Sequence, residues 1–351
     1  MNSISLRVDG PLRLGLLGAA RIAPAAAIEP ARGLVDVVGL AARDRGRAEA
    51  FATVHGVPRV FEDYAALVES PEVEAVYIGL PCALHHEWTS RALDAGKHVL
   101  CEKPLSCNAR ETRQLVERAA GAGLVLMEAH HWRYHPLAAR IGAHLRSGVL
   151  GTLRRMSAVF DAPIHDPDDI RWRLELGGGA LMDLGCYPVQ WLRFAAGGRG
   201  RVLSATAEEH SPGVDRSMRA TLEFPGPIEA TLACSMDPAG AFRATLRIEG
   251  EEGVLAVDNP VAPHAGHELV LTTTAGERRE RVPGSTTYRH QLEAFVEGVR
   301  SGAPVLTGGD DAIATATLMD AIYTAAGLPL RGERPMAAAP AELEFAGKLP
   351  E

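Results

Sequence analysis

The stretch LRLGLLGAARIA, residues 12–23, joins an apolar run to a turn of small residues. The run is typical of a buried parallel strand, and the turn fits the dinucleotide pattern G-x-G-x-x-[GA] with Gly18, Ala20 and Ala23. Gly18 suits a tight turn and Ala23 suits close helix–sheet packing. Ala20 adds a methyl group where the backbone must approach a pyrophosphate. The stretch predicts a dinucleotide-binding turn, and a merely tight strand-to-helix turn is the alternative.

Strands and helices alternate from this turn to about residue 130. Buried strands are expected at 12–17, 35–42, 73–80, 98–101 and 124–128, and helices at 20–32, 45–55, 63–69, 86–95 and 109–122. Asn108, with Glu111 three residues later, predicts the start of the last of these helices, and Gly96 and Gly123 predict helix ends. This alternation predicts an α/β fold with a doubly wound, parallel Rossmann sheet.

After about residue 150 the pattern changes to alternating runs separated by short turns. Runs such as TLRRMSAVFDA, RSMRATLEF and IEATLACSM predict a large, open, mostly antiparallel sheet, and helices are expected near 288–301 and 310–326. We therefore expect a Rossmann domain at 1–129 and an α+β domain for substrate binding and oligomerisation at 130–351. The stretch from 327 to 351, rich in proline and alanine, is expected to be a loosely packed tail.

Composition argues against several classes of partner. The 351-residue chain has a formal net charge of −8, whereas binding to nucleic acid needs a basic face. No apolar run reaches the length of a membrane span, and the N-terminus lacks the pattern of a signal peptide. The five cysteines form no C-x-x-C pair and the histidine pairs lack zinc spacing. We therefore expect no metal site, reduced thiols and a cytoplasmic protein.

The end of the second expected strand reports on the cofactor. NAD-binding proteins usually place a carboxylate there for the ribose 2′-hydroxyl, whereas NADP-binding proteins accommodate the 2′-phosphate with arginine. Here the strand ends Ala41-Ala42-Arg43-Asp44, and the Arg43 guanidinium can bind a phosphate through two N–H groups. We expect NADP(H) to be preferred, and Asp44 keeps NAD(H) as an alternative.

Lys103 lies in the stretch HVLCEKPLSC, residues 98–107, and is one of three lysines in a chain with 33 arginines. A desolvated ammonium can give up its proton, whereas a guanidinium stays charged. A lysine at a strand end therefore suits acid–base chemistry, or the tuning of a neighbouring acid. The alternative is chance in a lysine-poor composition.

Five motifs follow one another along the chain: GLLGAARIA, AARD, YIGLPCALHHEW, GKHVLCEKPL and GGGALMDLGCYPV. Together they resemble the glucose–fructose oxidoreductase/inositol dehydrogenase (Gfo/Idh/MocA) family from about residue 12 to 330. The resemblance is closest to the branch with trans-dihydrodiol dehydrogenase and NADP-dependent D-xylose dehydrogenases, where alanine is frequent at the middle of the turn. It implies an active site between the two domains, a cis Lys103–Pro104 peptide bond, and a homodimer or homotetramer.

Hydride transfer to or from an alcohol carbon requires a group that handles the hydroxyl proton. Tyr187 is the candidate for this role, with Lys103 as the cation that helps it ionise. Lys103 could instead hold the substrate hydroxyl or be the base itself. Asp183 could orient the lysine or a sugar hydroxyl, and a charge near a helix N-terminus is its alternative role.

Cofactor contacts are expected from Gly18, Ala20, Arg21, Ile22, Arg43, Leu80, Pro81, His85, Glu102 and Lys103. For Pro81 and His85, which the resemblance places on the nicotinamide side of the cofactor, ordinary packing is the alternative. Substrate contacts are expected from His131, Trp132, Arg171 and Trp172, for which ordinary packing is the alternative.

These residues predict an NADP(H)-dependent oxidoreductase acting on a secondary alcohol, ketone or hemiacetal of a sugar, cyclitol or cyclic diol. Two alternatives stay open. One is an enzyme resembling NAD-dependent glycosidases, which oxidises a sugar transiently and recycles its cofactor. The other is a non-catalytic dinucleotide sensor, although the presence of Lys103, Asp183 and Tyr187 argues against it.

Overall fold

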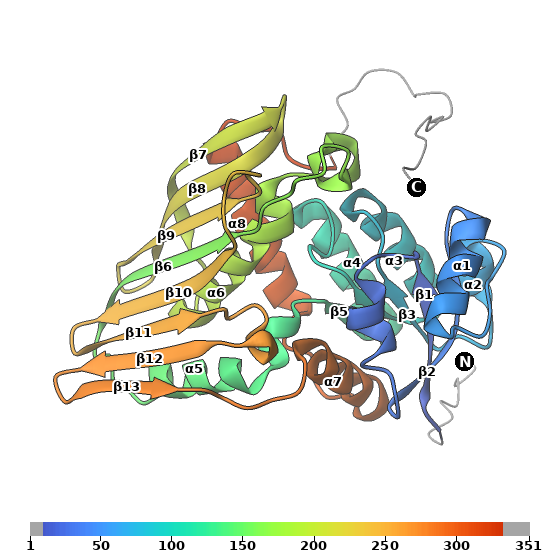
Figure 1. Ribbon diagram of the computed structural model, residues 1–351, viewed down its shortest axis with the longest axis horizontal. Coiled ribbons are helices and arrows are strands. Elements are labelled where there is room, and N and C mark those ends of the chain that lie inside the picture. The colour runs from blue at the N-terminus through green and yellow to red at the C-terminus, as the bar shows by residue number, and fades with distance from the viewer. Residues whose placement is uncertain (1–9, 333–351) are drawn as a thin grey trace.

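The computed structural model describes residues 10–332, which form two sheets with helices packed on and between them (Figure 1). The N-terminal strands are β1 (Leu12–Leu17), β2 (Val35–Ala41), β3 (Ala75–Ile78), β4 (His98–Cys101) and β5 (Leu126–Glu128). They form a parallel sheet in the order β2-β1-β3-β4-β5. Both faces of this sheet are covered, which explains the almost continuous apolar runs of its strands. The predicted Rossmann sheet is confirmed.

Four α-helices connect these strands: α1 (Arg45–His55), α2 (Tyr64–Glu69), α3 (His85–Asp94) and α4 (Ala109–Ala122). The Asn108 side chain accepts a hydrogen bond from the Glu111 backbone N–H at 3.0 Å, so α4 begins where the sequence predicts. Gly123 follows its last residue and ends it. The short helix η2 (Cys82–Leu84) leads from β3 into α3.

The helix predicted at 20–32 is wrong. Only the five-residue segment η1 (Pro24–Ile28) is helical, with a wide i→i+5 turn in which Glu29 N–H donates to the Pro24 carbonyl at 2.8 Å. Glu29 still has helical backbone angles, but Pro30 lacks the N–H that a further helical hydrogen bond needs, so the helix ends there. Residues 19–23 remain an open turn beside the strand ends.

The C-terminal sheet has eight strands: β6 (Leu153–Asp161), β7 (Arg201–Ser211), β8 (Val214–Phe224), β9 (Ile228–Ser235), β10 (Arg243–Gly250), β11 (Gly253–Asp258), β12 (Glu268–Thr273) and β13 (Gly276–Glu280). Their order is β13-β12-β11-β10-β6-β9-β8-β7, and all neighbours are antiparallel except β6 and β9. The large, mostly antiparallel sheet is therefore confirmed.

Helices cover the face of this sheet that looks toward the N-terminal half (Figure 1). The helices that follow β5 are η3 (His131–Tyr134), α5 (Pro136–Arg146), η4 (Ile170–Trp172), η5 (Leu174–Leu176), η6 (Leu181–Gly185), α6 (Cys186–Ala196), η7 (Pro263–Ala265), α7 (Thr287–Ser301) and α8 (Gly309–Ala325). Of these, α5, η6, α6 and α8 contribute buried residues to the core on this face of the sheet, whereas α7 packs against the N-terminal half. Met218 and Leu222 of β8 are fully buried in the core that includes Trp191 of α6 and Ile322 of α8. The intervening residues of β8, such as Arg219 and Thr221, point to the other face. Among residues 10–332, no helix combines the length and the apolar character of a bilayer span.

The last part of the described chain returns to the N-terminal half. Leu292 and Phe295 of α7 are fully buried in the same core as Leu14 of β1. The predicted loose tail is wrong for residues 327–332, because Leu328 and Leu330 pack against the C-terminal core and Arg331 is 1% exposed. The rest of that predicted tail, residues 333–351, lies outside the described residues.

Candidate active site

The predicted dinucleotide turn lies between β1 and β3, where the order of the parallel strands reverses. Ligands bind outside the carboxyl ends of the strands at such a switch point. Gly18 has φ +99°, and a Cβ on it would lie 2.8 Å from the Gly79 carbonyl oxygen. Only glycine fits this position. The backbones of the two glycines therefore lie close together at the switch point, where the sequence predicts the dinucleotide turn.

Two side chains of this turn are open to solvent. The Arg21 side chain is 77% exposed and Ile22 is 38% exposed, a high value for a large aliphatic residue. Ala20 lies close to Gly79, since a Cβ on that glycine would be 3.3 Å from the Ala20 methyl group. The predicted cofactor residues of the turn therefore lie together at the switch point of the sheet.

At the end of β2, the Asp44 carboxylate accepts a hydrogen bond from the Arg47 backbone N–H at 2.6 Å and so caps α1. The Arg47 guanidinium reaches back to the Ala19 carbonyl oxygen at 3.0 Å. Arg43 is exposed beside them. The carboxylate that kept NAD as an alternative thus has a structural role, while two arginines lie near the dinucleotide turn.

Lys103 follows β4 and reaches across to the C-terminal half. Its Nζ donates to the Asp183 backbone carbonyl at 2.7 Å and to Asp183 Oδ1 at 2.9 Å. The Lys103–Pro104 peptide bond is cis, as the resemblance implies. Burial lowers the pKa of Lys103, but the charges of Asp183, Cys186 and Glu102 together raise it above its usual value. Lys103 is therefore a charged ammonium at neutral pH.

Tyr187 lies under this ammonium. Lys103 Nζ is 5.3 Å from the centroid of the tyrosine ring, and the phenol oxygen is 3.0 Å from His131 Nε2. Burial raises the pKa of Tyr187 well above its usual value. The Lys103 cation faces the ring of this tyrosine, and the role of its charge in ionising the phenol stays a prediction. Tyr187 is a neutral phenol.

Asp183 and Tyr187 lie on a continuous helical segment that begins as a π-helix and continues as an α-helix. The segment η6 that holds Asp183 is π-helical, and α6 begins at Cys186. Pro188 has no N–H and its ring would clash with the carbonyl four residues earlier, which accounts for the widened turn. The predicted four-residue spacing still places both side chains against Lys103.

A chain of ion pairs connects this cluster with the dinucleotide turn. Arg171 Nε donates to Asp183 Oδ2 at 2.8 Å, and its Nη1 donates to Asp169 at 3.1 Å. Asp169 also accepts a hydrogen bond from Arg21 at 2.7 Å. Burial raises the pKa of Asp183, but Lys103 and Arg171 together lower it to about 2. Sequence reasoning missed Asp169, because nothing in the stretch DPDDIRW distinguishes one aspartate from the others.

Other predicted cofactor residues follow the ends of β3 and β4, where Leu80, Pro81 and Glu102 are half-buried and His85 is buried. Glu102 accepts a hydrogen bond from Tyr77 at 2.9 Å, and burial raises the pKa of Glu102. His85 is 1% exposed, and its two ring nitrogens face the Leu80 and Pro104 carbonyl oxygens, both at 2.8 Å. His85 therefore connects the loop that contains Leu80 and Pro81 with the lysine loop, which fits the packing alternative for this residue.

Three of the four predicted substrate residues are buried. Trp132 is 1% exposed and packs against Trp191 and Phe194 in the core. Trp172 is 6% exposed, stacks on His210 and donates to the Asp166 carbonyl at 3.1 Å. His131 is 4% exposed and lies behind Tyr187. Packing therefore accounts for both tryptophans, whereas Arg171 stays partly exposed beside Asp183.

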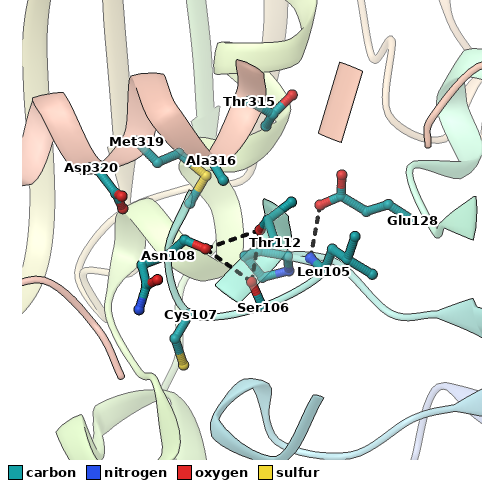
Figure 2. Close-up of a pocket in the computed structure, with 11 residues that line it drawn as sticks. Leu105, Ser106, Cys107, Asn108, Thr112, Glu128, Thr315, Ala316, Met319 and Asp320 are labelled. Atoms are coloured by element: carbon teal, nitrogen blue, oxygen red, sulfur yellow. Dashed lines mark hydrogen bonds between the residues drawn. The ribbon is translucent and has the colours of Figure 1, made fainter. Parts of the chain in front are cut away.

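A small cavity lies behind the lysine loop (Figure 2). The Leu105 backbone N–H donates to Glu128 at 2.9 Å on one side, and Ser106 and Thr112 form a hydrogen bond of 2.7 Å on another. Its volume is about 10 Å³, and α8 closes it through Thr315, Ala316 and Met319. A space of this size suits one water molecule and excludes a nucleotide or a sugar.

Residues 12–130 match the Gfo/Idh/MocA oxidoreductase family, described as having an NAD-binding Rossmann fold, and residues 138–256 match the Gfo/Idh/MocA C-terminal domain. The chain belongs to the Gfo/Idh/MocA family. It is therefore an enzyme of an oxidoreductase family whose relatives are named dehydrogenases and reductases. The suspected resemblance is confirmed, including its branch, since trans-1,2-dihydrobenzene-1,2-diol dehydrogenase of Macaca fuscata fuscata is 36% identical over 64% of this chain and 66% of its own.

Relatives of this Gfo/Idh/MocA member span nearly its whole described length. D-xylose 1-dehydrogenase (NADP(+)) 2 of Haloferax volcanii is 34% identical over 90% of this chain and 97% of its own. A dTDP-3,4-didehydro-2,6-dideoxy-alpha-D-glucose 3-reductase of Streptomyces violaceoruber is 37% identical over 93% and 99%. A 3-ketoreductase from Actinomadura kijaniata, solved with NADP and TDP-benzene, has a TM-score of 0.82 at 30% identity and covers 90% of this chain and 98% of its own.

Proposed function

We propose that this chain is an NADP(H)-dependent oxidoreductase that interconverts a secondary alcohol and a ketone, or a hemiacetal and its oxidised form, on a sugar, cyclitol or cyclic diol. One observation carries the proposal. A charged lysine and a neutral tyrosine, Lys103 and Tyr187, meet at the carboxyl edge of the parallel sheet, where Gly18 and Gly79 also lie.

The preference for NADP(H) rests on the end of β2. Arg43 is exposed there, Arg47 lies over the dinucleotide turn, and the Asp44 carboxylate is engaged in capping α1. Guanidinium groups suit a ribose 2′-phosphate, which a carboxylate would repel. The named relative from Haloferax volcanii is NADP-dependent, and the reductase from Actinomadura kijaniata was solved with NADP. Both support the same cofactor here.

Proton handling follows from the two pKa shifts. The bound nicotinamide would supply or accept the hydride. In the direction of reduction, the neutral Tyr187 phenol is a suitable proton donor to the carbonyl oxygen. Two of the three N–H groups of Lys103 bind Asp183, and the third would donate to the same oxygen and stabilise the negative charge that develops there. His131 holds the tyrosine oxygen from behind.

The substrate class rests on Arg171 and on the relatives. The Arg171 side chain is 35% exposed beside Asp183, so this ion pair presents both donors and acceptors to a hydroxyl-rich ligand. Two of the relatives act, by name, on a pentose and on a nucleotide-linked keto sugar. Both support a sugar or a closely related polyol as the substrate of this chain.

A screen tests the proposal. Purified protein is mixed with NADP or NAD and with aldoses, inositols and cyclic diols in turn, or with NADPH and ketoses and keto sugars, and nicotinamide absorbance is followed. We expect stoichiometric change with NADP(H) and at least one sugar-like compound. Hydrolysis of a glycoside without a net change in nicotinamide absorbance would support the glycosidase alternative. Binding of NADP(H) without turnover of any compound would support a sensor.

Three further proposals accompany this function. We place the division between a cofactor domain and a substrate domain near residue 130, between β5 and η3. We propose a homodimer or homotetramer through the C-terminal sheet, because its helices cover only one face (Figure 1). A cytoplasmic location is supported by the five cysteines, all of which are unpaired thiols. Light scattering at micromolar concentration tests the assembly, and a monomer would contradict it.

A further inference from the structure

Arg331, at the end of the described chain, is fully buried in an ion pair with Asp215 of β8. Arg331 Nη2 donates to Asp215 Oδ1 at 2.8 Å, and both side chains are 0% exposed. The guanidinium also donates from Nε to the Gly178 carbonyl at 2.8 Å and from Nη1 to the Pro329 carbonyl at 2.8 Å. Burial of two charges is costly unless their geometry and hydrogen bonds are well matched. Here each of the three guanidinium nitrogens donates a hydrogen bond to an acceptor.

This ion pair holds the glycine turn that leads to the proposed proton-handling helix. Asp215 Oδ2 accepts a hydrogen bond from the Leu181 backbone N–H at 2.7 Å, and Oδ1 accepts one from the Tyr323 hydroxyl at 3.0 Å. The first bond lies two residues before Asp183. Arg331 and Asp215 therefore bind both sides of the turn, one through the Gly178 carbonyl and one through the Leu181 N–H.

The turn fits against the ion pair so closely that it needs glycine. Gly179 has φ +132°, a conformation that side chains other than glycine rarely adopt. A Cβ on Gly179 would clash with Asp215 Oδ1 and would lie 2.8 Å from Arg331 Nη2. The triple glycine of the sequence is thus explained by its approach to this buried pair, in addition to any approach to a ligand.

The same segment binds the loop that carries Lys103. The Asn108 side chain donates from Nδ2 to the Arg331 carbonyl at 2.8 Å. A Cβ on Gly332 would lie 2.8 Å from the Cys107 Cβ, so residues 331 and 332 are packed tightly on the lysine loop. Arg331 thereby contacts both halves of the site: the N-terminal loop through its backbone and the C-terminal turn through its side chain.

We propose that Arg331, with Asp215, is a positioning residue that sets the glycine turn, and through it Asp183 and Tyr187, against the Lys103 loop. The expected loss of turnover rests on the proposed function. The expected ordering of the glycine turn rests only on the hydrogen bonds described above. A displacement of about 1 Å between reacting groups can cost about 10²-fold in rate. Arg331 does not touch the dinucleotide turn, so its removal should spare cofactor binding.

The test uses the full chain with Arg331→Ala, which leaves a space for added guanidinium ion. Hydrogen exchange followed by mass spectrometry compares the peptide over 177–187 with the peptide over β6. We expect faster exchange in the first and little change in the second. Turnover should fall about 10²-fold while the Kd for NADPH changes by less than about threefold. Millimolar guanidinium should restore part of the turnover and of the protection, whereas urea, its neutral analogue, should not.

The matched control is Arg140→Ala. Arg140 makes a bidentate pair with Glu280, at 2.6 and 2.8 Å, between α5 and β13 and away from the glycine turn. The Arg140→Ala substitution should lower the stability of the protein, and added guanidinium should not change the turnover of this variant. If Arg331→Ala does not fold, the double variant Asp215→Asn/Arg331→Met removes both buried charges. Its hydrogen exchange at 177–187 is then measured, and its loss of kcat is compared with the change in its Kd for NADPH.

Two results would overturn the inference. One is unchanged turnover and unchanged exchange at 177–187 in a folded variant. The other is a uniform rise in exchange across the chain with a turnover loss equal to the fraction unfolded and no rescue. If the wild-type protein turns over no compound in the screen, the proposed function fails, and the exchange comparison still decides whether Arg331 positions the turn.

Discussion

The dinucleotide turn and the Lys103 cluster lie at the same edge of the parallel sheet, yet they are built in opposite ways. The turn comes from consecutive residues, its arginine and isoleucine side chains are exposed, and backbone shape defines it. The cluster joins Lys103 with Asp183, 80 residues away, and Tyr187, and it is mostly buried and held by charge. Local sequence can therefore specify binding of a cofactor, whereas proton chemistry depends on how the two halves meet.

Replacement of Lys103 should give the largest effect on the cluster and leave the turn intact. We expect Lys103→Arg and Lys103→Met each to lose about 10²-fold or more in turnover, the scale of a group that acts in proton transfer. The larger, planar guanidinium does not fit the place of an ammonium that donates to two oxygens of Asp183. Stopped-flow or steady-state kinetics, with the Kd for NADPH measured in parallel, checks this.

Lys97 is the matched control lysine. It is buried at the start of β4, and its Nζ donates to the Ser70 and Val73 carbonyls, both at 2.8 Å. Lys97→Met should lower stability and leave the turnover of the folded protein close to wild type. Near-wild-type turnover in Lys103→Arg would show that only positive charge is needed, and the distinction between the cluster and an ordinary ion pair would disappear.

Replacement of the tyrosine shows whether the cluster acts as one unit. Tyr187→Phe keeps the ring under Lys103 but removes the hydroxyl, and turnover should fall about 10²-fold. The double variant with Lys103→Met should fall little further, because groups that act together are not additive. Tyr134→Phe, which removes a hydroxyl bonded to Thr307 at 2.8 Å, is the control. Fully multiplicative losses would mean that the two residues act separately.

Acid should weaken the cluster before it affects the turn. The Asp183 pKa is lowered to about 2. A lowered carboxylate pKa adds stability that is present above the usual aspartate value and is lost as pH falls through the folded value. The shift corresponds to about 2 kcal/mol of unfolding free energy. The raised pKa of Lys103 acts in the opposite sense, so its contribution persists through neutral pH and is lost only in strong alkali.

Urea unfolding between about pH 5 and about pH 2 measures this loss. The difference between wild type and Asp183→Asn should shrink by about 2 kcal/mol as the pH falls, because the asparagine variant has no carboxylate to protonate. A difference that stays constant over this range would show that Asp183 is not stabilised by Lys103 and Arg171.

The smallest effect is expected at the cofactor end of the comparison. Arg43→Ala should weaken NADP(H) binding about tenfold and leave NAD(H) unchanged, the usual size for loss of one charged hydrogen bond. Arg45→Ala is the matched control, since Arg45 pairs with Glu49 on α1 at 2.8 Å. Titration by nicotinamide fluorescence gives both constants. Equal affinity of the intact protein for the two cofactors would contradict the preference.

Much of the fold could be predicted, because it depends on local patterns. Strand β4 and helix α4 lie at the expected residues, and Asn108 caps α4 as its spacing indicates. The helix predicted after β1 is wrong, because only Pro24–Ile28 is helical there and Pro30 lacks the N–H needed to continue it. The spacing of Asp183 and Tyr187 was informative despite Pro188, because a widened turn still leaves residues four apart on one side.

The contacts that could not be predicted are those between distant segments. Asp169 and Arg331 are ordinary charged residues in the sequence, and only the tertiary structure brings them to Arg21, Arg171 and the glycine turn. Trp132 and Trp172 are candidates for substrate contact in the sequence, and the structure buries both in the core, as the packing alternative has it. Residue types in the sequence therefore indicate which chemistry a site could have. Only the tertiary structure shows which of the charged and aromatic residues lie beside that site and which are buried elsewhere.

Helix α7 also has a consequence for the synthesis of the protein. Leu292, Phe295 and Val299 complete the core behind β1, although β1 leaves the ribosome more than 270 residues earlier. During translation, the apolar surface behind β1 therefore stays exposed until α7 has been synthesised. Such a surface is a site for chaperone binding and for aggregation. A stop codon just before α7 would release a chain that cannot close its cofactor domain, so truncation there should yield insoluble protein rather than a smaller functional one.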